Sequence, residues 1–307
     1  MIHNPQVNAH LREKGVIFLQ DTYGKQLIPF SEITEEDVVV IPAFGTTLEI
    51  EAMLNKKGLE TQEYNTTCPF VEKVWNRSEQ IARKNYSIVV HGKPKHEETR
   101  ATFSHASSHT PTVVINDMQE AHLLAQYIRG EKNQVQFENE FAGRYSQGFN
   151  VATDLQRIGV VNQTTQLATD TQAIAEYLKH VMLQYYSLDA DSIDTHFADT
   201  RDTLCYATSD NQSSVNGLLE VDADLAIVVG GYNSSNTSHL VELCAEKLPT
   251  YFINGADKLI SPQQINHCNW KTKKESITEN YLPEKKPLRI LITSGASCPD
   301  AIVEDVI

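Results

Sequence analysis

Two of the five cysteines stand where a thiol could bind a metal or act as a nucleophile. Cys68 directly precedes Pro69, and proline is favoured at the first position of a helix. The positive end of a helix dipole favours the thiolate, which is the form of cysteine that binds metals. Cys205 precedes a second helical pattern. The alternative for each is a buried structural thiol, the interpretation we adopt for the remaining three: Cys244, Cys268 and Cys298.

The spacing of the cysteines limits the kind of site that they can form. No pair is separated by two residues, which excludes a zinc ribbon and a ferredoxin-type run. The odd number and wide spacing of the cysteines argue against a disulfide framework. A metal site in this chain would therefore collect its ligands from distant segments.

Polar clusters supply the other candidate groups. His91 and His96 lie close to Glu97 and Glu98, and a histidine beside a carboxylate can relay protons or hold a phosphate. The run from residue 233 to residue 236 reads Asn-Ser-Ser-Asn before a helix, which suits an anion cradle. Solvated surface groups and an ordinary turn with an N-cap are the respective alternatives. The run lacks a Walker lysine, so the sequence does not indicate nucleotide hydrolysis. No Gly-x-Gly-x-x-Gly motif follows a strand, which argues against direct NAD binding.

Short β-branched runs that alternate with helical patterns must position these groups. Continuous apolar strands of this kind are typical of parallel sheets covered on both faces, so we predict an α/β fold. Each run ends in a polar or glycine-containing loop, and ligands bind beyond the carboxyl ends of parallel strands. The predicted strands cover residues 38–41, 88–90, 158–161, 226–229 and 290–292.

Helices and connections complete this organisation. Apolar spacing predicts helices after Pro69 and over residues 169–183, and Thr237 or Ser238 could cap another helix. The polar, aromatic stretch 127–149 is interpreted as a long connection or insertion, and the charged stretch 271–287 as a surface loop.

Composition narrows the class of protein. A chain of 307 residues suggests two or three α/β units. The net charge of −14 argues against a nucleic-acid partner, which would need a basic face. No apolar run is long enough to span a membrane and the N-terminus does not resemble a signal peptide, so we expect a cytoplasmic protein with no membrane partner.

The order of these segments resembles the 4-hydroxy-3-methylbut-2-enyl diphosphate reductase family, in the form found in cyanobacteria and plants. The resemblance implies three small α/β units with parallel sheets in pseudo-threefold arrangement around a central site. The expected units are residues 1–67, which form an incomplete first unit, 68–204 and 205–307. The matching segments begin at His3, Pro42, Thr66, His91, His96, Asn162, Cys205, Asn233 and Thr293.

The resemblance also implies roles for particular residues. Cys68 and Cys205 match two of the three thiolates that hold a 4Fe-4S cluster in the family. Glu98 matches the residue that relays protons, with Thr164 beside it and His96 near the hydroxyl of the substrate. The implied substrate-binding residues are His3, His96, Thr165, Ser234, Ser235, Asn236 and Ser297.

The implied reaction is the reductive dehydroxylation of an allylic diphosphate to isopentenyl and dimethylallyl diphosphate in the methylerythritol phosphate pathway. A ferredoxin or flavodoxin is the electron donor that the family suggests. The chain departs from the family pattern because no Gly-Phe-Cys segment with the first cluster cysteine precedes His3, so we expect a truncated chain with impaired activity. Two alternatives remain open: a non-catalytic homologue that binds diphosphate without a cluster, and a zinc hydrolase with Cys and His ligands.

Overall fold

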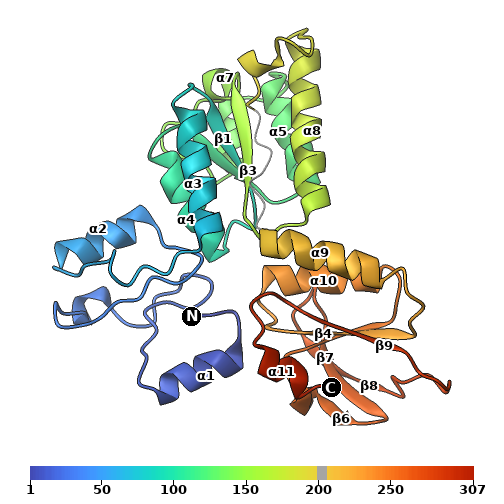
Figure 1. The fold of residues 1–307 in the computed structure, drawn as a ribbon. Helices are drawn as coiled ribbons and strands as arrows, with labels where there is room; N and C mark the ends of the chain where they lie inside the picture. The colour runs from blue at the N-terminus through green and yellow to red at the C-terminus, as the bar shows by residue number, and fades with distance from the viewer. Residues whose placement is uncertain (199–205) are drawn as a thin grey trace. The chain divides into compact units, whose positions relative to one another are not determined.

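The computed structural model describes residues 1–198 and 206–307, which form two compact units (Figure 1). Unit 1 combines Met1–Phe18 with Tyr206–Ile307, and unit 2 comprises Leu19–Cys205. Each unit contains a three-stranded parallel sheet with helices, which confirms the predicted α/β class. Among the described residues, no helix is both long and apolar enough for a membrane span.

The sheet of unit 2 has the strand order β2-β1-β3, with β1 (Ser87–His91) in the centre. Strands β2 (Thr112–Ile115) and β3 (Ile158–Asn162) both pair with β1 in parallel. Helices α3 and α4 lie on one side of this sheet, and α5 and α8 lie on the other (Figure 1). The helices of unit 2 are α2 (Leu48–Lys56), α3 (Pro69–Ala82), α4 (Glu97–Ser107), α5 (Met118–Ile128), α6 (Gln134–Glu140), α7 (Val151–Asp154) and α8 (Ala168–Tyr185).

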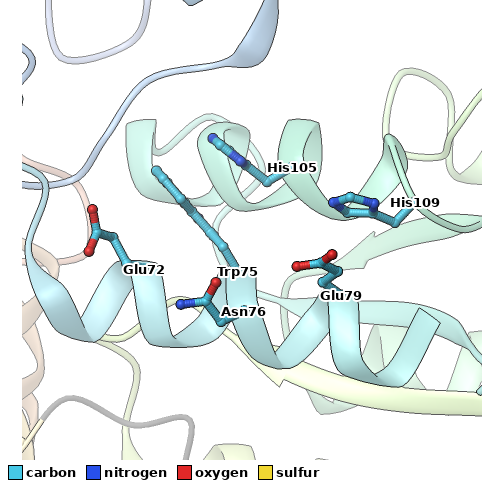
Figure 2. Close-up of a pocket in the computed structure, with 6 residues that line it drawn as sticks. All are labelled: Glu72, Trp75, Asn76, Glu79, His105 and His109. Carbon is cyan, nitrogen blue, oxygen red and sulfur yellow. The ribbon is translucent and has the colours of Figure 1, made fainter. Parts of the chain in front are cut away.

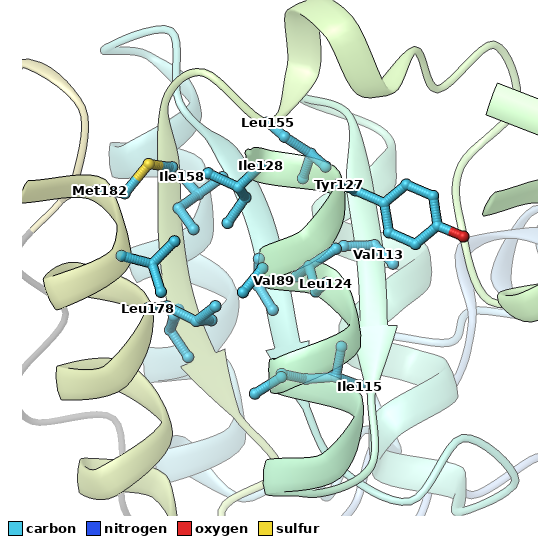
Figure 3. Packing of buried hydrophobic residues seen from close by; sticks show 14 of the residues in the cluster. Val89, Val113, Ile115, Leu124, Tyr127, Ile128, Leu155, Ile158, Leu178 and Met182 are labelled. Atoms are coloured by element: carbon cyan, nitrogen blue, oxygen red, sulfur yellow. The ribbon is translucent and has the colours of Figure 1, made fainter. Parts of the chain in front are cut away.

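Alternate side chains of these strands fill two separate cores. Successive strand residues point to opposite faces, so Val89 packs toward α5 and α8 while Ile88 and Val90 pack toward α3 and α4. Figure 3 shows the first core, in which Leu124 of α5 and Leu178 of α8 meet the sheet. Every residue of the central strand is buried, as a parallel strand with helices on both faces requires.

Unit 1 repeats the same strand arrangement. Its parallel sheet has the order β5-β4-β9, formed by β4 (Leu225–Val229), β5 (Thr250–Ile253) and β9 (Ile290–Ser294). A second, antiparallel sheet consists of β6 (Leu259–Ser261), β7 (Gln264–Cys268) and β8 (Glu275–Glu279). The helices of unit 1 are α1 (Pro5–Glu13), α9 (Tyr206–Leu218), α10 (Ser235–Ala245) and α11 (Asp300–Glu304).

In both parallel sheets the chain leaves the central strand toward one neighbour and later returns on the other side. The strand order therefore reverses between β1 and β3 in unit 2, and between β4 and β9 in unit 1. Such a reversal opens a crevice at the carboxyl ends of the two strands, where ligands bind in open α/β sheets. The loops that follow these four strands are the polar loops singled out in the sequence.

Four of the five predicted strands are confirmed as β1, β3, β4 and β9, whereas the strand predicted over residues 38–41 is wrong. Only Ile41 makes a bridge, to Asn65, and Val38 and Val40 are 64% and 58% exposed. A β-branched run forms a strand only where a neighbouring strand can pair with it. The helices predicted after Pro69 and over residues 169–183 are confirmed as α3 and α8.

Three other interpretations of the sequence need correction. The stretch 127–149, predicted to be a long connection or insertion, contains helix α6 and contributes to the core, because Phe137 of α6 is completely buried there. The stretch 271–287 contains β8, which pairs with β7. The cap of α10 is Ser234 rather than Thr237 or Ser238, since the Ser234 hydroxyl accepts a hydrogen bond from the backbone N–H of Thr237. The proposed division into three units stays a prediction.

Candidate active site

Two loops meet at the point in unit 2 where the strand order reverses. His91 ends β1 and Asn162 ends β3, and the two residues are partners in the parallel ladder. The backbone N–H of Gln163 donates to the carbonyl of His91 at 2.8 Å, which extends the pairing by one step. Gly92 follows His91, and a Cβ at this position would lie 2.6 Å from Thr99 Oγ1, so the close approach of the loop to α4 requires glycine.

Helix α4 and the loop after β3 bring three of the predicted residues together. His96 caps α4, and its Nδ1 accepts a hydrogen bond from the backbone N–H of Glu98 at 3.2 Å. The Glu98 carboxylate accepts a hydrogen bond from the backbone N–H of Thr164. Glu98 is 3% exposed and Thr164 is 4% exposed. A buried carboxyl group at the first turn of a helix, joined to a second loop, is suited to controlled proton transfer.

Cys68, also in unit 2, is the N-cap residue of α3, and Pro69 is the first helical residue, as expected. The backbone N–H of Cys68 donates to the carbonyl of Ala43 at 2.8 Å, which joins the start of α3 to a second loop. The side chain is half-buried and forms no disulfide with any of the other described cysteines. Cys205, the second predicted cluster ligand, lies outside the described residues.

The other three cysteines have the environment of structural thiols. Cys244, Cys268 and Cys298 are all buried. Burial raises the pKa of all three thiols, and it raises the pKa of Cys244 to about 11. A raised pKa keeps a thiol protonated at neutral pH and makes it a poor metal ligand.

In unit 1 the loop after β4 and the start of α10 form a polar cradle, defined here as Ser234, Ser235, Asn236 and Thr237. All four residues are at most 4% exposed. Ser235 Oγ, both polar side-chain atoms of Asn236 and Thr237 Oγ1 have no hydrogen-bond partner within the part of the chain that the structure describes. Buried polar atoms normally have partners, so this arrangement at a helix N-terminus is suited to an anionic ligand.

Neighbouring segments of unit 1 border the cradle. A Cβ added to Gly295 would lie 2.0 Å from Thr237 Oγ1, so the loop after β9 passes close to the cradle. Ser297 is exposed in that same loop. His3 is half-buried, and its carbonyl oxygen would lie 1.4 Å from a Cβ on Gly231. The structure thus places His3, the cradle and Ser297 in one unit, and places Cys68, His96, Glu98, Thr164 and Thr165 in the other.

Sequence reasoning missed Lys273, which lies in the turn between β7 and β8. Its Nζ donates to the carbonyl of Tyr232 at 2.7 Å and to Ser238 Oγ at 2.8 Å. Ser238 Oγ in turn donates to the carbonyl of Ser234. The lysine therefore braces the cradle loop and brings a positive charge close to it. The charged stretch around Lys273 gave no signal of this contact in the sequence. The contact forms only when the β7–β8 hairpin packs against the loop after β4 and the start of α10.

A separate hollow of about 350 Å³ lies between α3 and the end of α4 in unit 2 (Figure 2). The rings of Trp75 and His105 stack in it with centroids 3.7 Å apart. Burial lowers the pKa of His105 to about 4, an effect that the nearby His109 reinforces and that Glu49 and the Thr46 backbone oppose. His105 is therefore neutral at physiological pH. The hollow is lined by Glu72, Trp75, Asn76, Glu79, His105 and His109.

We expect His105 to make unit 2 less stable in acid. The unfolded chain binds a proton at the ordinary histidine pKa of 6.5, whereas the folded unit resists protonation until about pH 4. The contribution of His105 to stability should therefore decrease as the pH falls from 6.5 to about 4, by up to about 1.4 kcal/mol per pH unit, and this contribution should not change further below pH 4. Urea unfolding followed by Trp75 fluorescence in a Trp270→Phe background measures this slope. His105→Gln should remove this slope, whereas His109→Gln, which removes only a secondary cause of the shift, should reduce it less. Equal slopes in all three proteins would contradict the prediction.

Comparison with known proteins identifies the family of this chain. The family model for LytB protein matches residues 1–307. A 4-hydroxy-3-methylbut-2-enyl diphosphate reductase of Picosynechococcus is 40% identical over 310 residues, covering 100% of this chain and 73% of the relative. A reductase of the same name from Synechococcus is 41% identical over 308 residues, with the same coverage.

Solved structures show the same fold. An (E)-4-hydroxy-3-methyl-but-2-enyl diphosphate reductase, described as the terminal enzyme of the non-mevalonate pathway, superimposes with a TM-score of 0.53 at 27% identity, covering 99% of this chain and 83% of that one. The E-1-hydroxy-2-methyl-but-2-enyl-4-diphosphate reductase from Plasmodium falciparum gives a TM-score of 0.66 at 22% identity, covering 99% and 74%, and supports the fold alone. With a family match from its first residue to its last and relatives about 40% identical, the chain belongs to the LytB family.

Proposed function

We propose that this chain reduces 4-hydroxy-3-methylbut-2-enyl diphosphate to isopentenyl and dimethylallyl diphosphate. In this reaction the allylic C–O bond breaks, two electrons and two protons are taken up, and the hydroxyl leaves as water. The names of relatives that align with the whole chain support this assignment. The activity belongs to isoprenoid biosynthesis.

The observation that best supports the proposal is the polar cradle of unit 1. A diphosphate group presents many negatively charged oxygens, and these match donors such as Ser235 Oγ and Asn236 Nδ2, which are buried without partners in the described residues. The dipole at the start of α10 favours the same charge. We propose His3 and Ser297 as further ligands of the diphosphate, since both belong to unit 1.

Unit 2 supplies the groups that we propose for proton transfer. We propose that Glu98, whose carboxyl group is buried, delivers the proton, and that the Thr164 backbone orients this carboxyl group. His96 and the half-buried Thr165 lie on the flanking loop segments and are proposed to bind the hydroxyl side of the substrate. A proton delivered from a buried acid reaches the reacting centre without competition from solvent.

The environment of Cys68 fits an iron–sulfur cluster. Its thiol is half-buried at the N-terminus of α3, and cysteine thiolates are the protein ligands of iron–sulfur clusters. We propose Cys68 and Cys205 as ligands of a 4Fe-4S cluster, which when bound would supply the electrons and a Lewis acid for the hydroxyl. A one-electron donor such as ferredoxin or flavodoxin would provide the electrons.

Anaerobic reconstitution of the 307-residue chain with iron and sulfide tests the proposal. We expect bound iron and labile sulfide in cluster stoichiometry, visible charge-transfer absorption, and conversion of the allylic diphosphate to the two products in the presence of a reductant. Tight diphosphate binding without a cluster or turnover would instead support a non-catalytic binding protein. Stoichiometric zinc in place of iron would support a hydrolase.

A further inference from the structure

Gln163, a residue that no other part of the proposal uses, lies at the centre of the unit 2 site. It follows β3 directly and is 0% exposed. Its Oε1 accepts hydrogen bonds from the backbone N–H of Lys93 at 3.1 Å, from Thr99 Oγ1 at 2.9 Å and from Gln166 Nε2 at 3.1 Å. Its Nε2 donates to Thr165 Oγ1 at 2.6 Å. One amide thus connects both loops of the site with α4.

These contacts determine which way the amide of Gln163 points. The oxygen and nitrogen of a glutamine amide are distinguished by their partners, and a backbone N–H can only donate. The atom that faces Lys93 N must therefore be the oxygen, and the atom that faces Thr165 must be the NH₂ group. Because an amide NH₂ group cannot accept, the Thr165 hydroxyl accepts in this contact and keeps its own proton for a different partner.

We propose that Gln163 is a positioning residue that makes Thr165 a hydrogen-bond donor to an oxygen of the substrate. This inference rests on the function proposed above and adds a specific direction of hydrogen bonding to it. Thr165 is half-buried, whereas Gln163 and Gln166 are buried, so the hydroxyl is the accessible end of the network. A hydroxyl whose oxygen is already engaged loses less freedom when it donates to a ligand.

Reversing the polarity of this single contact tests the proposal. The glutamate of Gln163→Glu has nearly the same shape as glutamine and keeps an oxygen toward Lys93. Its second oxygen, however, faces Thr165 as an acceptor, so the Thr165 hydroxyl donates its hydrogen bond to the carboxylate instead of to the substrate. We expect the dissociation constant of the apo chain for 4-hydroxy-3-methylbut-2-enyl diphosphate, measured by calorimetry, to rise about ten-fold. Thr165→Val should have a similar effect, and Thr165→Ser, which keeps the hydroxyl, should restore binding.

The double variant separates positioning from general damage. If Gln163 acts through the Thr165 hydroxyl, Gln163→Glu should add little to the loss already caused by Thr165→Val. Additive losses, an unchanged dissociation constant in Thr165→Val, or no binding by the wild-type chain would each overturn the inference. Gln163→Met, which removes the donor without burying a charge, takes the place of Gln163→Glu if thermal melting shows that the carboxylate unfolds the unit. Because binding is measured without a cluster, failure of this inference is distinct from failure of reductase turnover.

Discussion

Replacing Glu98 by glutamine is expected to lower kcat by about 10²- to 10⁴-fold, the usual contribution of a positioned acid or base. The glutamine side chain has the same shape, and its oxygen can still accept the hydrogen bond from the Thr164 backbone. The variant should therefore fold and bind the substrate normally but lack the transferable proton. The turnover rate at saturating substrate measures the loss of proton delivery, and the dissociation constant for the substrate measures any loss of binding.

The matched control for this experiment is Glu72→Gln. Glu72 also lies in the first turn of a helix of unit 2, but its side chain is exposed rather than buried. It should leave kcat within about two-fold of wild type, because interactions of a solvent-exposed carboxylate are weak. Undiminished turnover in Glu98→Gln would show that another group delivers the proton.

Replacing Asn236 by leucine is expected to weaken substrate binding by about 10- to 100-fold without lowering the stability of the chain. A hydrogen bond to a charged group contributes about 1.5–3 kcal/mol, and the substitution removes the amide donor proposed for the diphosphate. Both polar atoms of Asn236 are buried without partners in the described residues, so an apolar side chain of similar size should leave the melting temperature unchanged or higher. Calorimetry with inorganic pyrophosphate and thermal melting measure the two quantities.

Asn8→Leu makes the same chemical change where the amide has a structural role. Both polar atoms of Asn8 bond the backbone of Ile2, at 2.9 and 2.7 Å. Its loss should lower the melting temperature, since two backbone groups lose their partners. If Asn236→Leu were destabilising to the same degree as Asn8→Leu, the cradle would be a structural feature rather than a binding site.

Local sequence patterns identified the strands and helices whose environment agrees with their own propensity. The runs that became β1, β3, β4 and β9 are strongly apolar and β-branched, and each lies in a sheet covered by helices. The run at residues 38–41 has the same composition but does not form a strand, because strand formation depends on a neighbouring strand that the run itself does not encode. The N-cap and capping-box signals around Asn133 and Gln136 were readable in the sequence and would have revealed α6.

The sequence by itself determined the α/β class, the polar loops that end the strands and the residue types that can bind an anion or transfer a proton. Only the tertiary structure decided which loops meet, because the reversal of strand order that places His91 beside Asn162 is a property of the sheet. It also decided that Gln163 directs Thr165 and that Lys273 braces the cradle. Hydrogen bonds between residues far apart in the chain depend on how the elements pack, and no local spacing encodes that packing.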